Sequence, residues 1–109
     1  MAESLKVLAQ SAPAATTLTD VYTVPSLTSA TVSTITVCNR SATATTFRLS
    51  VAVAGAVDAV QQYIYYDQTI DGNSTFGITI GMTLGAADKI RVYVGSATIS
   101  VNVFGVEVN

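Results

Sequence analysis

The 109-residue sequence contains no histidine and no tryptophan, and its only cysteine is Cys38. Histidine is the commonest general base and metal ligand, so its absence removes the usual partner of catalytic triads and metal centres. Without an imidazole to activate it, Cys38 is not expected to be a nucleophile, and a single cysteine cannot form an internal disulfide. We therefore expect no catalytic residues, no cofactor and no metal, and we interpret Cys38 as a small buried apolar side chain.

Charge is also scarce. Five Lys or Arg and seven Asp or Glu give a net charge of −2. Nucleic-acid-binding surfaces need clustered basic residues, so no nucleic acid partner is expected. No apolar run approaches the roughly 20 residues of a membrane span. Residues 1–15 resemble a secretory signal only weakly, because Glu3 stands where positive charge is wanted and LKVLA is too short for the apolar segment, so we expect no such signal. A chain with so few charges to cover its surface is expected to bury part of that surface against a partner.

Apolar and polar residues alternate along much of the chain. The clearest cases are TTFRLSVAVAG (residues 45–55), DKIRVYVG (88–95) and TISVNVFGVEV (98–108). A period of two is typical of strands with one buried face, here including Phe47, Leu49, Val51 and Val53. Gly105 predicts a bulge or bend in the last strand. With turn residues between the segments, the pattern predicts an all-β fold, an antiparallel β-sandwich of about seven or eight strands, for which a jelly roll is one topology.

The N-terminal residues are expected to behave differently from the rest. Pro13 lies in the Ala-rich stretch SAPAATT and blocks regular pairing, and convincing alternation begins only near Thr16. We predict an N-terminal arm over residues 1–15 and a single sandwich domain over residues 16–109. In that domain, ATVSTITVCN (residues 30–39) offers neither a charge nor a bulge to prevent edge pairing. Such an unprotected strand edge predicts a homo-oligomer or a lattice-bound subunit.

One short motif resembles a calcium loop. DQTIDG places the first, third, fifth and sixth loop positions at Asp67, Thr69, Asp71 and Gly72. The twelfth position, which should be a bidentate glutamate, is Ile78, and the flanking segments are predicted strands instead of helices. Aspartates in turns commonly accept hydrogen bonds from nearby backbone amides. We therefore expect a plain turn and no metal site.

The stretch QQYIYYDQTID, residues 61–71, concentrates aromatic side chains next to a turn. Simple alternation places Tyr63 and Tyr65 on one face and Tyr66 on the other. Two interpretations are open: the tyrosines cover a sandwich edge, or they anchor a subunit interface, where Tyr gives contact area at low entropic cost. The DGNS tip tolerates positive φ and predicts a stiff, exposed projection. The candidate interface is Tyr63, Tyr65, Tyr66, Asp71 and Asn73.

Longer blocks carry a resemblance to a known family. They are APAATTLTDVYTVP, VSTITVCNRSATATTFRLSVA, YIYYD, TFGITIGMTL, DKIRVYV and VNVFGVEV, and together they cover nearly the whole chain. In these blocks the chain resembles small virion structural proteins of tailed bacteriophages, including cyanophages. The resemblance implies a non-catalytic protein located in the virion, as a capsid decoration or as part of a tail, neck or fibre. Its partners would be other virion proteins. Relatives often carry a proline-containing loop where this chain has QTIDGNST.

A carbohydrate-binding sandwich is the alternative. It would recognise host surface glycans by stacking a sugar ring on Tyr63, Tyr65 or Tyr66. The absence of tryptophan weighs against this function.

Overall fold

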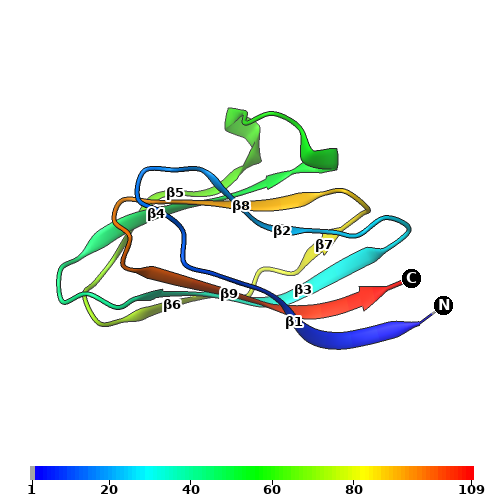
Figure 1. Ribbon diagram of the computed structural model, residues 1–109, viewed down its shortest axis with the longest axis horizontal. Helices are drawn as coiled ribbons and strands as arrows, with labels where there is room; N and C mark the ends of the chain where they lie inside the picture. Colours follow the sequence, from blue (N-terminus) through cyan, green and yellow to red (C-terminus); the bar gives the residue numbers. More distant parts are fainter. Residues whose placement is uncertain (1) are drawn as a thin grey trace.

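The computed structural model describes residues 2–109, which form two β-sheets packed face to face (Figure 1). Sheet A has the order β1-β9-β3-β6, with β7 also paired to β3, and sheet B has the order β2-β8-β4-β5. The strands of sheet A are β1 (Glu3–Ser11), β3 (Ser29–Asn39), β6 (Thr75–Ile78), β7 (Met82–Leu84) and β9 (Ile99–Val108). Those of sheet B are β2 (Thr19–Thr23), β4 (Thr45–Ala52), β5 (Tyr63–Ile70) and β8 (Lys89–Val94). These strands all pair antiparallel.

The strand order is that of a jelly roll. Strands β6 and β7 pair with successive parts of β3 and therefore act as one interrupted strand. With that strand counted once, sheet A holds the first, eighth, third and sixth strands, and sheet B the second, seventh, fourth and fifth. Two sheets wound in this way form the eight-stranded jelly roll. The predicted antiparallel sandwich is confirmed, and the jelly roll is the topology found.

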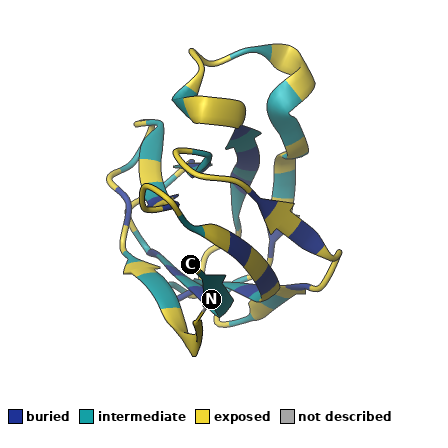
Figure 2. Cartoon of the chain, turned by 90° about the vertical axis from the view of Figure 1, so that its right-hand side faces the viewer, coloured by how far each residue is buried: buried dark blue, intermediate teal, exposed yellow. Residues whose placement is uncertain are grey.

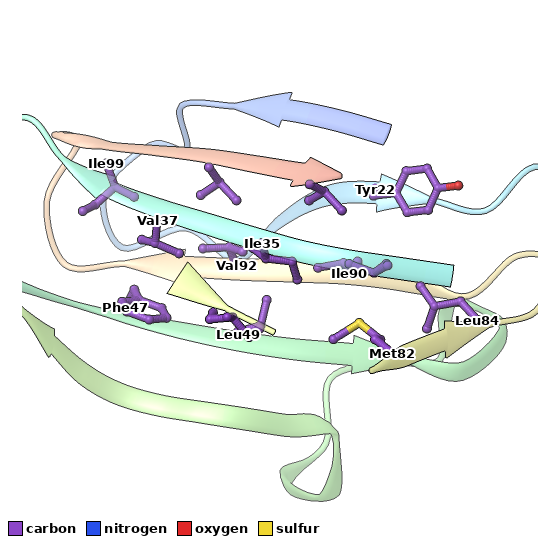
Figure 3. Packing of buried hydrophobic residues seen from close by; sticks show 14 of the residues in the cluster. Tyr22, Ile35, Val37, Phe47, Leu49, Met82, Leu84, Ile90, Val92 and Ile99 are labelled. Atoms are coloured by element: carbon purple, nitrogen blue, oxygen red, sulfur yellow. The ribbon is translucent and has the colours of Figure 1, made fainter. Parts of the chain in front are cut away.

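The core between the sheets is built from the alternating residues (Figure 3). Most of the inward residues of β4, β8 and β9 are fully buried, namely Phe47, Leu49, Ile90, Val92, Val94, Ile99, Val101 and Val103. Val51, predicted to belong to the buried row of β4, packs against the core but is only partly buried. Val53 was predicted to continue the β4 row but is 70% exposed. The strand ends at Ala52, and a 3-10 turn over Val53–Gly55 leads the chain away from the sheet.

The predicted N-terminal arm is wrong for residues 3–11. They form β1, an edge strand of sheet A that pairs with β9 from Glu3 opposite Val108 to Ser11 opposite Val101. Pro13 ends the pairing only after β1 is complete. The chain then crosses to sheet B, where Ala15 makes an isolated bridge to a β8 residue. Met1 lies outside the described residues.

Residues 30–39 were predicted to be an unprotected edge, and this too is wrong. They belong to β3, which lies inside sheet A between β9 and the β6–β7 pair. An interior strand needs no charge to prevent unwanted pairing, which explains the uncharged sequence. Cys38 is partly exposed on this strand instead of buried. The edge strands of the sandwich are β1, β2, β5 and the β6–β7 pair.

The bulge predicted at Gly105 of β9 lies in the two neighbouring strands instead, where Ser33 of β3 and Leu8 of β1 are the extra residues. The β3–β9 register shifts between Val32 and Thr34, and the β1–β9 register shifts at Leu8, close to the same part of β9. A Cβ atom on Gly105 would lie 2.2 Å from the carbonyl oxygen of Thr31. Only glycine therefore allows β3 to approach β9 this closely.

Glu107 links three strands at the end of the sandwich where both termini lie (Figure 1). The Tyr22 hydroxyl on β2 donates a hydrogen bond to Glu107 Oε2 at 2.5 Å, and Lys6 Nζ on β1 lies 2.7 Å from Oε1. The hydrogen bonds from Lys6 and Tyr22 lower the pKa of Glu107. Burial, together with the bond to Glu107, raises the pKa of Tyr22. The cluster joins sheet B to sheet A and fastens the edge strand.

We expect Gly105→Ala to lower the free energy of unfolding by about 1–3 kcal/mol, because the new methyl group forces β3 and β9 apart. Gly77→Ala on β6 is the matched control, since a Cβ there would meet no atom within 4 Å. Denaturant unfolding of both variants measures the difference. Equal stability of the two variants would contradict the close approach at Gly105.

Glu107 should make stability depend on pH. Its pKa lies below the ordinary 4.5 in the folded chain, so its ionised form stabilises the fold above that pH, and the contribution is lost as the pH falls through the folded pKa. Glu107→Gln cannot ionise and should be less stable than the wild type by about 1 kcal/mol at neutral pH. Urea unfolding at neutral and at strongly acidic pH should show this gap closing in acid. A gap of constant size would refute the ionic contribution.

Candidate functional site

A bulge in β5 builds a cluster around Arg48 on the outer face of sheet B. Tyr66 and Asp67 both lie opposite Arg48 of β4, with Asp67 at a φ of 50°. A bulge sets two residues of one strand against one residue of its partner. Arg48 contacts both of them: Nε lies 2.7 Å from Asp67 Oδ1, and the guanidinium carbon lies 4.1 Å from the centre of the Tyr66 ring. The Tyr93 ring of β8 lies 4.5 Å from the same carbon.

A second bulge separates Tyr63 from Tyr65. Ile64 is an extra residue between the pairs Leu49–Tyr65 and Ser50–Tyr63. Residues that are paired across two strands share a face, and Leu49 and Ser50 face opposite sides of β4. Tyr65 therefore follows Leu49 into the core, and Tyr63 faces outward. The prediction that Tyr63 and Tyr65 share a face is wrong, because simple alternation does not allow for the extra residue.

The three tyrosines consequently have different surroundings. Tyr65 packs its ring 5.9 Å from the ring of Phe47 and 5.4 Å from that of Phe76, so it belongs to the core. Tyr63 lies edge to face with Tyr66, with ring centres 5.1 Å apart. Tyr66 is 60% exposed. Both open interpretations of the tyrosines thus remain for Tyr63 and Tyr66 only.

We call Arg48, Tyr63, Tyr66, Asp67 and Tyr93 the aromatic cluster. The hydrogen bond from Arg48 to Asp67 raises the pKa of Arg48. Partial burial, together with a 3.0 Å hydrogen bond from its hydroxyl to Asp58, raises the pKa of Tyr63. The cluster is therefore a set of mutually satisfied groups that holds its rings in place.

The β4–β5 connection, residues 53–62, stands above sheet B at the top of Figures 1 and 2. Arg91 of β8 holds it from below, donating hydrogen bonds to the carbonyl oxygens of Ala56 at 2.7 Å and Gly55 at 3.3 Å. Asp88 accepts a hydrogen bond from the Ala54 amide at 2.8 Å. Hydrogen bonds at several points therefore give this connection a defined conformation.

Asp20 of β2 completes the charged network under the connection. Its carboxylate lies 2.8 Å from Lys89 Nζ and 2.9 Å from Arg91 Nε. The hydrogen bonds from Lys89 and Arg91 lower the pKa of Asp20. Asp20 thus positions the arginine that anchors the connection.

Much of the connection is exposed, as the yellow parts at the top of Figure 2 show, and several of its residues and those at the start of β5 are large and apolar. We call this set the apolar rim: Val53 (70% exposed), Val57 (84%), Val60 (90%), Ile64 (42%) and Tyr66 (60%). The rim meets the aromatic cluster at Tyr66. The outer face of sheet B thus combines exposed apolar groups with a rigid aromatic base.

Asp71 and Asn73 lie at the opposite end of β5 from Tyr63, so the structure does not bring the five candidate interface residues together. Their turn also does not project. The Asn73 amide donates a hydrogen bond to the Ser41 carbonyl oxygen at 2.8 Å, and a Cβ on Gly72 would lie 2.1 Å from the carbonyl oxygen of Ala42. The prediction of an exposed projection is therefore wrong, although both side chains are exposed.

Asn39 fastens this end of the sandwich. It is buried, and its Nδ2 donates hydrogen bonds to the carbonyl oxygens of Thr43 at 2.9 Å and Asp71 at 3.3 Å. Its Oδ1 accepts hydrogen bonds from the Ser41 amide and the Thr98 hydroxyl. One amide thereby ties together the β3–β4, β5–β6 and β8–β9 connections.

The calcium-loop spacing does not form one loop, because residues 67–70 continue β5 and Asp67 pairs with Arg48. Among residues 2–109, no three His, Cys, Asp or Glu side chains gather where they could hold a metal ion. The same residues contain no helix that is long and apolar enough to cross a membrane.

Arg48 and Tyr93 were not among the candidate site residues predicted from the sequence. Their contact depends on the pairing of β4 with β8, in which Arg48 lies opposite Tyr93. Comparisons of the chain with models of protein families, with curated proteins and with solved structures found no match. The resemblance to virion proteins therefore stays a prediction.

The tyrosines should differ in their contribution to folding. Tyr65→Ala removes a ring that packs on Phe47 and Phe76, and we expect it to lower the free energy of unfolding by about 3 kcal/mol. Tyr66→Ala removes an exposed ring and a cation–π contact, for which we expect a loss of about 1 kcal/mol or less. Denaturant unfolding measures both. A larger loss for Tyr66→Ala than for Tyr65→Ala would contradict the inward placement of Tyr65.

Proposed function

We propose that this chain is a non-catalytic structural protein of a bacteriophage virion, either a capsid decoration or an assembly module of the tail, neck or fibre. The observation that carries the proposal is the apolar rim, whose five large side chains are between 42% and 90% exposed within residues 53–66. Several large apolar side chains that are exposed within one short segment are typical of interaction sites.

The rim is suited to binding because it is already ordered. Arg91 and Asp88 hold the connection, and Arg48 lies against the ring of Tyr66. Association is more favourable when the contact residues lose little conformational freedom. Tyrosine at such a surface combines apolar area with a polar hydroxyl and commonly contributes much of the binding energy. The apolar rim, including Tyr66, therefore forms the contact with a neighbouring virion protein or another copy of the chain.

Fold and resemblance agree with this function. Jelly rolls are found in viral capsid proteins and also in lectins, so the topology is compatible with the proposal without selecting it. The blocks that resemble tailed-phage virion proteins run through most of the sandwich and support a virion location.

Glycan binding remains the alternative function, and the aromatic cluster gives it less support. A sugar ring needs an open aromatic face, but Tyr65 packs in the core. Arg48 lies over the rings of Tyr66 and Tyr93, at 4.1 and 4.5 Å from their centres. The rings thus already have a cationic partner.

Substitutions in the rim should weaken assembly without weakening the fold. Val57 and Val60 are 84% and 90% exposed, so Val57→Asp and Val60→Asp should leave unfolding nearly unchanged. In competition with the wild-type chain for incorporation into particles, we expect each variant to be reduced about tenfold, as for loss of an interface anchor. Leu27→Asp, at a 91% exposed position on the β2–β3 connection, is the matched control. Normal incorporation of both rim variants would refute the proposed contact.

A further inference from the structure

Strand β1 leaves a row of backbone groups without a strand partner. Ala2 and Asn109 exchange two backbone hydrogen bonds, of 2.8 and 3.0 Å. Along an antiparallel pair, such hydrogen-bonded pairs recur at every second residue. The backbone groups of Ser4 and Lys6 therefore point toward β9. Those of Glu3, Leu5 and Val7 point to the open edge of sheet A.

The same three residues also place their side chains on the outer face of the sheet. Lys6 reaches Glu107, whose other oxygen binds core-lining Tyr22, so Lys6 faces inward and its neighbours face outward. Leu5 is 77% exposed and Val7 is 47% exposed. On the neighbouring strand β9, the residues paired with positions 3, 5 and 7 are Val108, Val106 and Phe104, and all three are partly exposed. Leu5 and Val7 therefore continue an apolar row on the outer face of sheet A.

We infer that this edge pairs with β1 of a second copy, in an antiparallel arrangement centred on Leu5. Strand addition to an open edge satisfies the free backbone groups of both copies. A two-fold axis at Leu5 sets Leu5 opposite Leu5 of the second copy, and Glu3 opposite Val7. All three residues have their free amides and carbonyls on this edge, so the arrangement forms three hydrogen-bonded pairs.

Charge selects this register over its neighbours. With Leu5 at the axis, Lys6 lies opposite Ser4 of the second copy, and no like charges meet. Moving the axis to Lys6 would set the two copies of that lysine against each other, which destabilises strand pairs. Moving it to Ser4 shortens the paired segment. Lysine often protects strand edges, but here the Lys6 side chain is held by Glu107 at 2.7 Å instead of extending over the edge.

The pairing extends the apolar row of the outer face across the two-fold axis, so Leu5 side chains of both copies become partly covered. A contact made by a single pair of strands is small compared with the roughly 1,200 Å² or more of stable complexes, so the dimer should be weak. The inference is separate from the virion role, because it concerns another face of the molecule and needs only the chain itself.

Sedimentation equilibrium of the purified chain, from micromolar to millimolar concentration, tests the pairing. We expect a reversible monomer–dimer equilibrium. Leu5→Pro removes an amide that faces the open edge while sparing the bonds to β9, and Leu5→Lys brings two positive charges together at the axis. Each should raise the dimer dissociation constant about tenfold or more. Leu27→Lys is the control for the same chemical change elsewhere and should dimerise like the wild type, as should Val57→Asp.

Cysteine substitutions test the register, in a chain whose own Cys38 is replaced by serine. Cα atoms of a hydrogen-bonded pair lie about 5.5 Å apart, within the range that a disulfide spans. Leu5→Cys should therefore cross-link two copies on mild oxidation, whereas Glu3→Cys should not. A wild-type chain that stays monomeric throughout, a dimer that survives both Leu5 variants, or cross-linking through Glu3→Cys instead of Leu5→Cys would each overturn the inference.

Discussion

The structure depends on burying one side of every strand between two sheets, and on the bulges that interrupt this alternation. Where the period of two is kept, as in β8, inward residues such as Ile90 and Val92 fill the core. Where it breaks, the side chains that follow change face. The bulge of β3 opposite Gly105 shifts the register of sheet A, and the two bulges of β5 send Tyr65 inward and Tyr66 outward.

This redirection connects the core to the proposed contact surface. The bulge at Tyr66 and Asp67 gives Arg48 a ring and a carboxylate from one strand, and the cluster in turn holds Tyr66 at the surface. Beside it, Arg91 anchors a connection whose valines are exposed. The opposite sheet ends in β1, an edge with free backbone groups. The apolar rim above sheet B and the open edge of β1 in sheet A are thus two different surfaces outside the buried core.

The sandwich could be predicted because its signals are local. Alternation around Leu49 and Ile90 marked buried faces, and Gly105 marked the place of an irregularity in sheet A, although the extra residues lie in β3 and β1 beside it. The bulge at Ile64 carries no glycine and left no such signal. Residues 3–11 were predicted to be part of an arm instead of a strand, because the extra residue Leu8 breaks the alternation that Leu5 and Val7 begin. Contacts such as Arg48 with Tyr93 depend on the order of strands in the sheet, which a single sequence does not reveal.

We propose that the outer face of sheet B is an assembly surface in a phage particle. A reconstruction of purified particles that carry this chain, at a resolution that traces side chains, tests it most directly. The account predicts density for a neighbouring subunit over the connection at residues 53–62 and over Tyr66, with Tyr65 enclosed in the sandwich. Particles that lack the chain, or that hold it with this face turned to solvent, would contradict it.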